Sequence, residues 1–506
     1  MDIPPEEEAA YQKVLAIDIA RRVILEELAQ IDRSRAEAYA DYCRLKNQRL
    51  SPILSTPPAE ILHRIFTIVF YDALMQERPL VALGLSHVCA HWRKLALDFT
   101  TIWTVIDTHF VPELVEMFLQ RSQQQPLDIW ISASNPKPLS EGAGLMVVQE
   151  IARWRRLVIV KNFCLAQNLL LLRDESAPLL EEIHITSLHN RTWAGIEEEP
   201  VQGIFLGGVP RLQRIQFYGI VLPNLWPPLV HLTALKIGGM HETTQRLSHV
   251  RFHSLVGSLP ALTHLVVHGE PIWHTERYNE GFIFPSLLVL ELGLSIEYYN
   301  SNPGHLSFPT FWLHSIAPVL ESLHLFYYYS SGAIRPEIVA TANFTPHSST
   351  PAFPALKSLA ITGTKVYCRM LPEEYFHALA VFFPNIRHLT SINYHNTILE
   401  MLRETDLWPD DMLLTLYNDV DSDPLDVIAV QNMLGTRRAR GRAIPRLGVS
   451  QTTPLEVLDS LRNEGDIELL LLESAPVPKW PGFDDLGTFF MDSLRIDDWA
   501  RAQKIS

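Results

Sequence analysis

Residues 287–292 read LLVLEL, and the same form, L-x-x-L-x-L, returns as LESLHL at 320–325 and LKSLAI at 356–361. Isoleucine, valine or phenylalanine replaces leucine in other copies. The clear copies begin at Leu180, Leu212, Leu232, Leu262, Leu287, Leu320 and Leu356. Weaker copies begin at Trp154 and Ile386, and fragments at 444–449 and 467–471 fit the last copies. Recurrence of one short pattern along some 300 residues indicates supersecondary units stacked side by side.

Each copy predicts one β-strand, because residues two apart on a strand point to the same face. The last two apolar positions of each copy therefore point into a common core. A proline stands one to three residues before the first apolar position in most copies: Pro178, Pro210, Pro260, Pro285, Pro318, Pro354 and Pro384. Proline ends a preceding helix or loop and favours an extended entry to the strand. The pattern predicts an α/β solenoid with a face of parallel strands.

This array resembles a degenerate leucine-rich repeat. Successive first leucines are 20 to 36 residues apart, whereas regular repeats of that class run about 20–29 residues. The asparagine that usually follows the L-x-L pair is absent. Insertions gather on the rims of a solenoid, so we expect binding loops in the long intervals. The candidate loops are 191–202, 269–281, 298–309 and 333–354.

A second informative stretch, residues 51–103, predicts short helices. Pro57-Pro58-Ala59-Glu60 is typical of a helix start, since proline fits the first turn and a carboxylate complements the helix dipole. The apolar stripe behind it is wider than a surface helix needs, and comprises Ile61, Leu62, Ile65, Phe66 and Val69. A second helical pattern comprises Val81, Leu85, Val88, Cys89, Trp92 and Leu95. A unit of this size is marginal alone and usually packs against something else.

This stretch resembles an F-box. The matching features are P-x-E-I-L from Pro58 to Leu62, the Ile65–Phe66 pair, S-x-V-C-x-x-W-R-x-L-A from Ser86 to Ala96, and Ile102–Trp103. The most similar group is the fungal F-box proteins with a helical leader before the box and a leucine-rich array after it. One position departs from the family, because Pro57 stands where a leucine usually precedes P-x-E.

The resemblance implies docking to a Skp-type adaptor and, through it, to a cullin. The expected adaptor-binding residues are Pro58, Glu60, Ile61, Leu62, Ile65, Phe66, Val88, Cys89 and Trp92. Some of these must pack the core of the box itself, and the sequence does not separate the two sets.

Residues 5–50 predict one long helix. Ile17, Ile24, Ile31, Ala38 and Leu45 recur every seven residues, and Val14, Leu28 and Tyr42 complete a heptad seam interrupted by Arg21 and Arg35. Such a seam is typical of a coiled coil. We consider three interpretations: an amphipathic helix packed on the rest of the chain, a homodimerising coiled coil, and a solvated helix.

Residues with catalytic or metal-binding chemistry do not form a recognisable pattern. His87-x-Cys89-x-His91 would not share a helix face, because neighbours on a helix are three or four residues apart. The strand histidines His184, His264 and His324 are expected to be surface or half-buried residues. The pair Gly238–Gly239 is expected at a turn. The sequence predicts no catalytic residue, no metal site and no cofactor, and an enzyme hidden in the array is the least favoured class.

Bulk properties limit the partners. Of 506 residues 47% are hydrophobic, and the formal net charge is −15; an acidic chain is a poor general ligand for nucleic acid. Four cysteines without metal spacing fit a reducing compartment, and no apolar run is long enough to span a membrane. We expect a soluble intracellular protein, cytoplasmic, nuclear or both. The acidic segment 404–426 is interpreted as solvated surface.

The arginine run 437–442 has three interpretations: a nuclear-localisation or phosphate-contacting patch, a phosphodegron pocket, and the exposed C-terminal end of a helix at 425–436.

These patterns divide the chain into a leader helix (1–50), an F-box (51–104), a linking helix and first strand (105–150), a solenoid (151–475) and a tail (476–506). The expected function is a substrate receptor of a Skp/cullin/F-box ubiquitin ligase whose array holds an unidentified substrate protein. The alternative is a non-catalytic interaction scaffold without ligase coupling.

Overall fold

The computed structural model of the 506-residue chain is described for part of its length. The described residues are 5–50, 57–132, 139–160, 165–186, 203–218, 226–238, 247–268, 272–273, 281–295, 315–328, 353–363, 379–393, 395–404, 408, 412–417, 425–442, 446–451, 453–463 and 468–473. All four candidate loops lie essentially outside these residues, as does the tail from residue 474.

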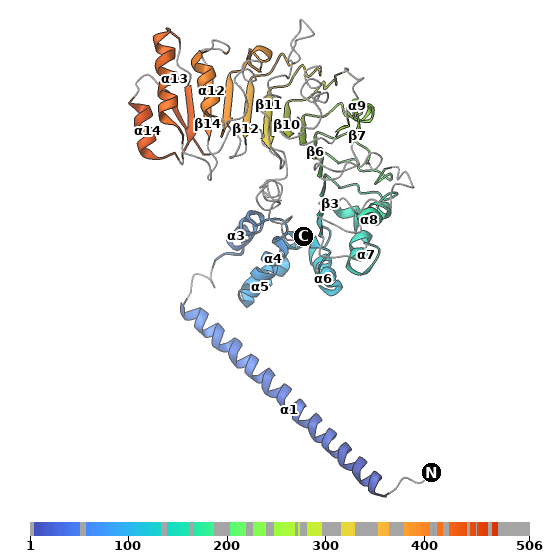
Figure 1. Cartoon of the computed structure of the whole chain (residues 1–506). Coiled ribbons are helices and arrows are strands. Elements are labelled where there is room, and N and C mark those ends of the chain that lie inside the picture. The colour runs from blue at the N-terminus through green and yellow to red at the C-terminus, as the bar shows by residue number, and fades with distance from the viewer. Residues whose placement is uncertain are drawn as a thin grey trace. The chain divides into compact units, whose positions relative to one another are not determined.

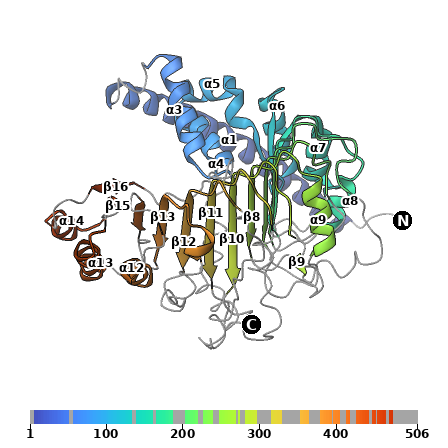
Figure 2. The same ribbon diagram turned by 90° about the horizontal axis from the view of Figure 1, so that it is seen from above.

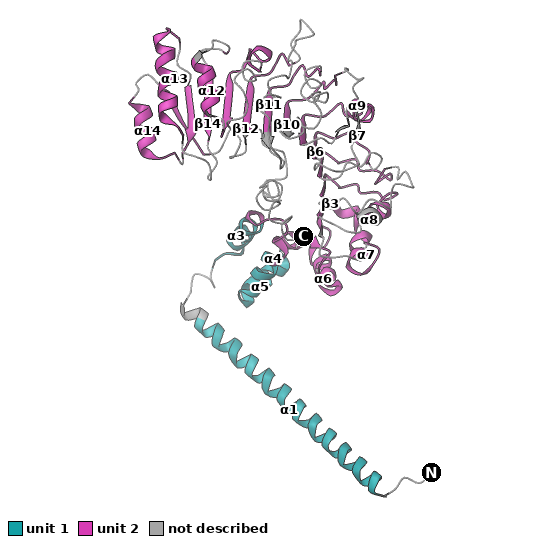
Figure 3. Ribbon diagram, in the orientation of Figure 1, with its two compact units in different colours: residues 1–70, 81–99 teal, residues 71–80, 100–506 magenta. Residues whose placement is uncertain are grey.

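The chain forms two compact units (Figure 3). The first comprises Met1–Phe70 and Val81–Phe99, and the second comprises Tyr71–Leu80 and Thr100–Ser506. The first unit contains the long helix α1 (Pro5–Leu50) and α5 (Ala90–Asp98). Helices α3 (Ala59–Asp72) and α4 (Arg78–His87) begin in one unit and end in the other.

Helix α1 confirms the expected leader helix, and acidic residues fill its first turn. The described side chains from residue 6 to 46 are exposed, apart from half-buried Cys43. The side chains of the heptad seam are therefore exposed in the single chain.

Helix α3 starts as its sequence predicts. The carbonyl of Pro58 accepts hydrogen bonds from the backbone N–H groups of Ile61, at 3.0 Å, and Leu62, at 3.2 Å. One side of the helix is core, with Leu62, Phe66 and Phe70 buried. The ring of Phe66 lies 5.1 Å from that of Trp92 on α5. Helix α3 therefore packs one half of its wide apolar stripe within the helical unit.

The second unit is built on a parallel sheet of 14 strands (Figure 1). Apart from β7 (Leu247–Ser248) and β9 (Ile272–Trp273), which pair with each other, the strands follow one another in chain order. They are β1 (Val105–Asp107), β2 (Leu127–Ser132), β3 (Trp154–Val160), β4 (Glu182–Thr186), β5 (Arg214–Tyr218), β6 (Ala234–Gly238), β8 (His264–His268), β10 (Val289–Ser295), β11 (Ser322–Tyr328), β12 (Ser358–Gly363), β13 (His388–Ile392), β14 (Leu413–Tyr417), β15 (Arg446–Ser450) and β16 (Leu469–Leu472).

Each L-x-x-L-x-L copy supplies one of these strands in the same register. Leu290 of β10 pairs with Leu265 of β8 and Leu323 of β11, and that row continues through the neighbouring strands. The predicted face of parallel strands is confirmed, and it extends beyond the seven clear copies. Strand β14 was not predicted.

The prolines lie in four-residue turns directly before the strands. The N–H of Leu180 bonds to the carbonyl of Ala177, and equivalent bonds close onto the residue before Pro210, Pro260, Pro318 and Pro354. Each proline therefore occupies the second position of a four-residue turn, where its fixed φ is favourable. The first leucine closes that turn, so the repeats enter their strands through a β-turn.

Helices and short 3₁₀ turns connect the strands. They are η1 (Thr100–Trp103), α6 (Pro112–Ser122), α7 (Gly142–Gln149), η2 (Ile151–Arg153), α8 (Leu165–Leu171), α9 (His249–Gly257), α12 (His395–Glu404), α13 (Val427–Ala439) and α14 (Leu455–Arg462). Figure 2 shows α12, α13 and α14 on one side of the sheet. The linking helix expected within 105–150 corresponds to α6, and the helix expected at 425–436 corresponds to α13.

Candidate binding surfaces

Helix α3 presents apolar side chains to solvent beside its buried face. Ile61 is 51% exposed and Ile65 is 38% exposed, and Ile68 and Val69 are exposed as well. These positions follow i, i+4, i+7 and i+8, which is one face of a helix. The wide stripe seen in the sequence thus splits into a core half and a solvent half. We call the solvent half, formed by Ile61, Ile65, Ile68 and Val69, the α3 apolar face.

The residues predicted to bind an adaptor fall into two groups. Pro58, Glu60, Ile61, Ile65 and Val88 are exposed and are free to contact another protein.

Leu62 and Phe66 are 1% and 0% exposed, and they pack the helical core. Cys89 is the N-cap of α5, where its Sγ accepts from the backbone N–H of Trp92 at 3.5 Å. Trp92 is half-buried against Phe66, and its indole N–H lacks a hydrogen-bond partner. These four residues shape the helical unit, whereas the exposed group forms its surface. The sequence did not single out Ile68.

The other candidate surface is the sheet face that carries the x positions of the repeats, here called the polar face. Side chains alternate across a strand, so the residue between the last two core positions points away from the core. The polar face includes His184, Gln216, Lys236, Glu291 and His324, all in one register row. His184, Gln216 and His324 are buried. Burying such polar groups is costly unless they are hydrogen-bonded.

A charge ladder crosses the first strands of this face. Arg155 donates hydrogen bonds to both carboxylate oxygens of Asp128, at 2.9 and 2.7 Å. Arg156 donates to Glu182 at 2.9 Å, and Arg214 donates to the other oxygen of Glu182. A register shift at Leu127/Asp128 lets two consecutive arginines of β3 reach this side.

Burial raises the pKa of Glu182, and the two arginines oppose that effect. Removing one member of the ladder would leave a buried charge without its partner.

A histidine–glutamate–histidine cluster lies further along the polar face. Nε2 of His268 is 2.6 Å from Glu291 Oε1, and Nδ1 of His324 is 2.9 Å from Glu291 Oε2. Nε2 of His324 is 2.8 Å from the hydroxyl of Thr362. Bonds to the two imidazoles hold the pKa of Glu291 well below its usual range despite burial, whereas burial lowers the pKa of His268. The cluster is an ionised carboxylate that accepts from two imidazoles and joins β8, β10, β11 and β12.

Glycines on the polar face make room for neighbouring rings. A Cβ on Gly238 would lie 2.4 Å from Cδ2 of Tyr218, and a Cβ on Gly293 would lie 2.6 Å from Cδ2 of His268. The His268 ring also stacks on Phe326, with centroids 5.9 Å apart. The expectation that Gly238 serves a turn is wrong, because it ends strand β6 and accommodates a ring from β5.

The strand histidines were expected to be surface or half-buried, which is wrong for His184 and His324. Burial lowers the pKa of His184 to about 3, and its Nε2 lies 3.0 Å from the hydroxyl of Thr186. Gln216 beside it is 2% exposed, and its Nε2 has no hydrogen-bond partner.

The arginine run does not form an open phosphate pocket. Arg437 is buried and donates to the carbonyl of Leu402 at 3.2 Å, and Arg440 donates to the carbonyl of Arg403 at 3.0 Å. Those carbonyls end α12, where cations are favourable. Both arginines therefore cap the neighbouring helix. These bonds favour the third interpretation of the run, the C-terminal end of a helix. The cations of the run bind carbonyls of α12 and also lie at the end of their own helix, α13.

Neither the family models nor the curated proteins compared with this chain give a match.

No group of three histidine, cysteine, aspartate or glutamate side chains in the described part of the chain is arranged to hold a metal ion. None of the helices described there is long and apolar enough to cross a membrane.

Proposed function

We propose that the chain is the substrate receptor of a Skp/cullin/F-box ubiquitin ligase. Residues 51–104 are the F-box in this proposal, and the parallel sheet is a degenerate leucine-rich solenoid. The α3 apolar face carries the proposal, because four exposed apolar side chains on one helix face suit a partner better than water. The F-box resemblance of the sequence names that partner as a Skp-type adaptor.

The proposed receptor works by positioning. The adaptor links it to a cullin, and the sheet-bearing unit holds a substrate protein, which raises the effective concentration of substrate lysines near a partner enzyme. No residue of this chain takes a catalytic role. The polar face contributes rigidity through its ion ladder and histidine cluster.

Substitutions at exposed positions of α3 test adaptor binding more directly than substitutions at buried positions do. A substitution at Leu62 would disrupt the core whatever the adaptor does, because Leu62 is buried. Ile61→Asp with Ile65→Asp places two carboxylates on the α3 apolar face without filling or emptying the core. Adaptor affinity, measured by pull-down and titration, should fall at least about 100-fold, since buried apolar anchors dominate interface energies.

The matched control is Ile428→Asp on α13, since Ile428 is 69% exposed. This variant should bind the adaptor as the unmodified chain does. Retained adaptor binding in the Ile61/Ile65 variant, with the control unchanged, would exclude the α3 apolar face.

The second candidate function is an interaction scaffold that lacks ligase coupling. Pro57 favours it, because a leucine usually stands there in the F-box family. Co-purification separates the candidates: a receptor retains the adaptor, whereas a scaffold does not. If the adaptor does not co-purify with the unmodified chain, Pro57→Leu should restore adaptor binding when Pro57 alone prevents it.

A further inference from the structure

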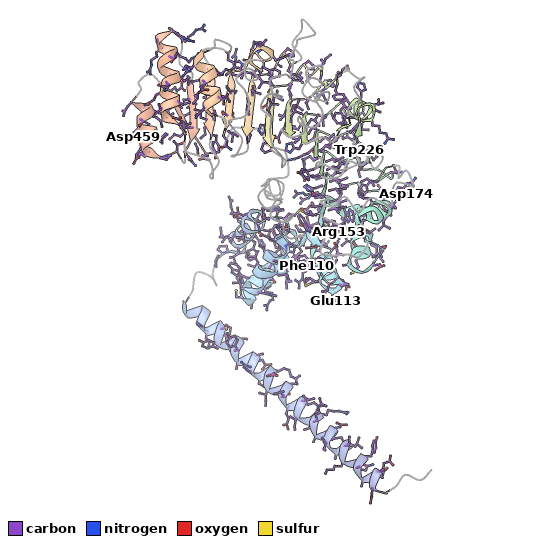
Figure 4. All side chains as sticks on the ribbon, in the orientation of Figure 1. Phe110, Glu113, Arg153, Asp174, Trp226 and Asp459 are labelled. Carbon is purple, nitrogen blue, oxygen red and sulfur yellow. The ribbon has the colours of Figure 1, made fainter. Side chains whose placement is uncertain are left out.

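Helix α1 carries a long apolar seam that the single chain leaves exposed. Its 46 residues make a rod of about 70 Å at 1.5 Å per residue. Ile17, Ile24, Ile31 and Leu45 are each more than half exposed. Figure 4 shows side chains standing out from this helix along its length. The seam from residue 14 to 45 exceeds four heptads, which is enough for a stable coiled coil.

The two arginines of the heptad seam distinguish a parallel from an antiparallel pair of α1 helices. In heptad terms, Arg21 and Arg35 occupy a positions with Val14, Leu28 and Tyr42. The d positions are Ile17, Ile24, Ile31, Ala38 and Leu45. A parallel pair in register places each a residue against the same residue of its partner. Arg21 would then face the partner's Arg21, and Arg35 the partner's Arg35, so both layers would oppose like charges.

An antiparallel pair places a residues against d residues. With Leu28 opposite the partner's Ile31, the outer layers match Val14 to the partner's Leu45 and Ile17 to the partner's Tyr42. Arg21 then faces the partner's Ala38, one of the smallest seam residues, which leaves space for the arginine stem. Arg35 faces the partner's Ile24, so its aliphatic stem packs on an apolar side chain and its charged end reaches the rim.

In this antiparallel pair, acidic residues of the partner helix lie beside the guanidinium groups of Arg21 and Arg35. In this register Asp41 of the partner flanks Arg21, and Glu27 of the partner flanks Arg35, at the same offset along the helix. In its own chain Asp41 contacts Arg44 through Oδ1 only, at 3.3 Å. That contact is an exposed pair, which contributes little. The arrangement is self-complementary, as a two-fold interface requires.

We propose that α1 pairs antiparallel with α1 of a second copy of this chain, with Leu28 opposite Ile31. The partner helix comes from a second copy of this chain, because α1 itself supplies both the arginines and the acidic residues that pair with them. The pairing does not depend on the proposed ligase function and would hold in the absence of an adaptor.

Cross-linking of the full-length chain tests the orientation. The background is Cys43→Ser, which removes the native thiol of α1. Val14→Cys and Leu45→Cys are made separately, purified, mixed and oxidised. Only the mixture should give a cross-linked dimer, because residue 14 lies beside the partner's residue 45 and far from the partner's residue 14. Dimers that form with either variant alone but not with the Cys43→Ser background would show parallel pairing, and no cross-link in the mixture would overturn the proposal.

Light scattering tests whether the seam causes the pairing. The unmodified chain should have twice the 57.6 kDa mass of one copy, and Ile24→Glu with Ile31→Glu should reduce it to one copy. The matched control is Ile19→Glu, because Ile19 is 55% exposed on the opposite side of the helix. The control should remain a dimer. Equal masses for the seam variant and the control would contradict the proposal.

Discussion

The imidazole of His268 lies across Gly293 of the next strand, where an added Cβ would come within 2.6 Å of Cδ2 and 2.8 Å of Cγ of the ring. The same imidazole contacts Glu291 through Nε2 and stacks on Phe326. Gly293 is therefore part of the polar face, because its missing side chain is what allows the histidine–glutamate–histidine cluster to form.

The Gly293→Ala variant tests this relationship. The added methyl group forces the ring away from Glu291 and Phe326, so the free energy of unfolding should fall by about 1–3 kcal/mol, as in other overpacked sites. Gly435→Ala is the control, since nothing lies within 4 Å of its Cβ position in α13. That control should gain about 0.5–1 kcal/mol from helix propensity. Denaturant unfolding measures both, and equal effects would refute the close approach.

Glu182→Ala should destabilise the sheet strongly. It leaves Arg156 and Arg214 without their shared carboxylate, and breaking a buried pair typically costs about 3–5 kcal/mol. The control is Asp459→Ala on α14, with Asp459 labelled in Figure 4. Asp459 and Arg462 form an exposed pair at 3.3 Å. Exposed pairs contribute at most about 1 kcal/mol. If the two variants unfold at the same denaturant concentration, the ladder is not a buried structural element.

His184 makes stability depend on pH. Its pKa is about 3 in the folded chain and about 6.5 when exposed. At a pH between these two values, His184 binds a proton in the unfolded chain but not in the folded chain. The free energy of unfolding should therefore fall by about 1.4 kcal/mol for each unit of acidification in that range from this group. His184→Gln should show a shallower loss between pH 6 and 4, and an unchanged slope would argue against a buried neutral imidazole.

Arg437→Ala should loosen α12. The substitution removes the guanidinium that binds the carbonyl of Leu402, which costs about 1–3 kcal/mol for a charged hydrogen bond. Hydrogen exchange should rise at the C-terminal turn of α12. Asn432→Ala, at an exposed position on the same helix, should leave that exchange unchanged. Identical exchange in both variants would contradict the capping role.

The core of the sheet was readable from the sequence because its signal is local. Leu287, Leu290 and Leu292 lie within six residues, and each clear copy supplied a strand in the expected register. Strand β14 was missed because Asp411 occupies the place of the first leucine, although Leu414 and Leu416 keep the other two. The width of the α3 stripe was also visible in the sequence, but its division into core and surface was not.

The polar face could not be predicted, because its partners are distant along the chain. His268 and Glu291 are 23 residues apart, and His324 and Thr362 are 38 apart. Repeat lengths vary, so the sequence alone does not show which x positions meet. Only the strand register brings them together. The role of Arg437 was hidden for the same reason, since its acceptor lies 35 residues away.

Co-expression of the full-length chain with a Skp-type adaptor tests the central proposal most directly. Size-exclusion chromatography with light scattering measures the mass and composition of the product. We expect a complex with one adaptor for each copy of this chain, and this complex should be lost in the variant with Ile61→Asp and Ile65→Asp. A folded chain that elutes apart from the adaptor would contradict the assignment as a ligase receptor.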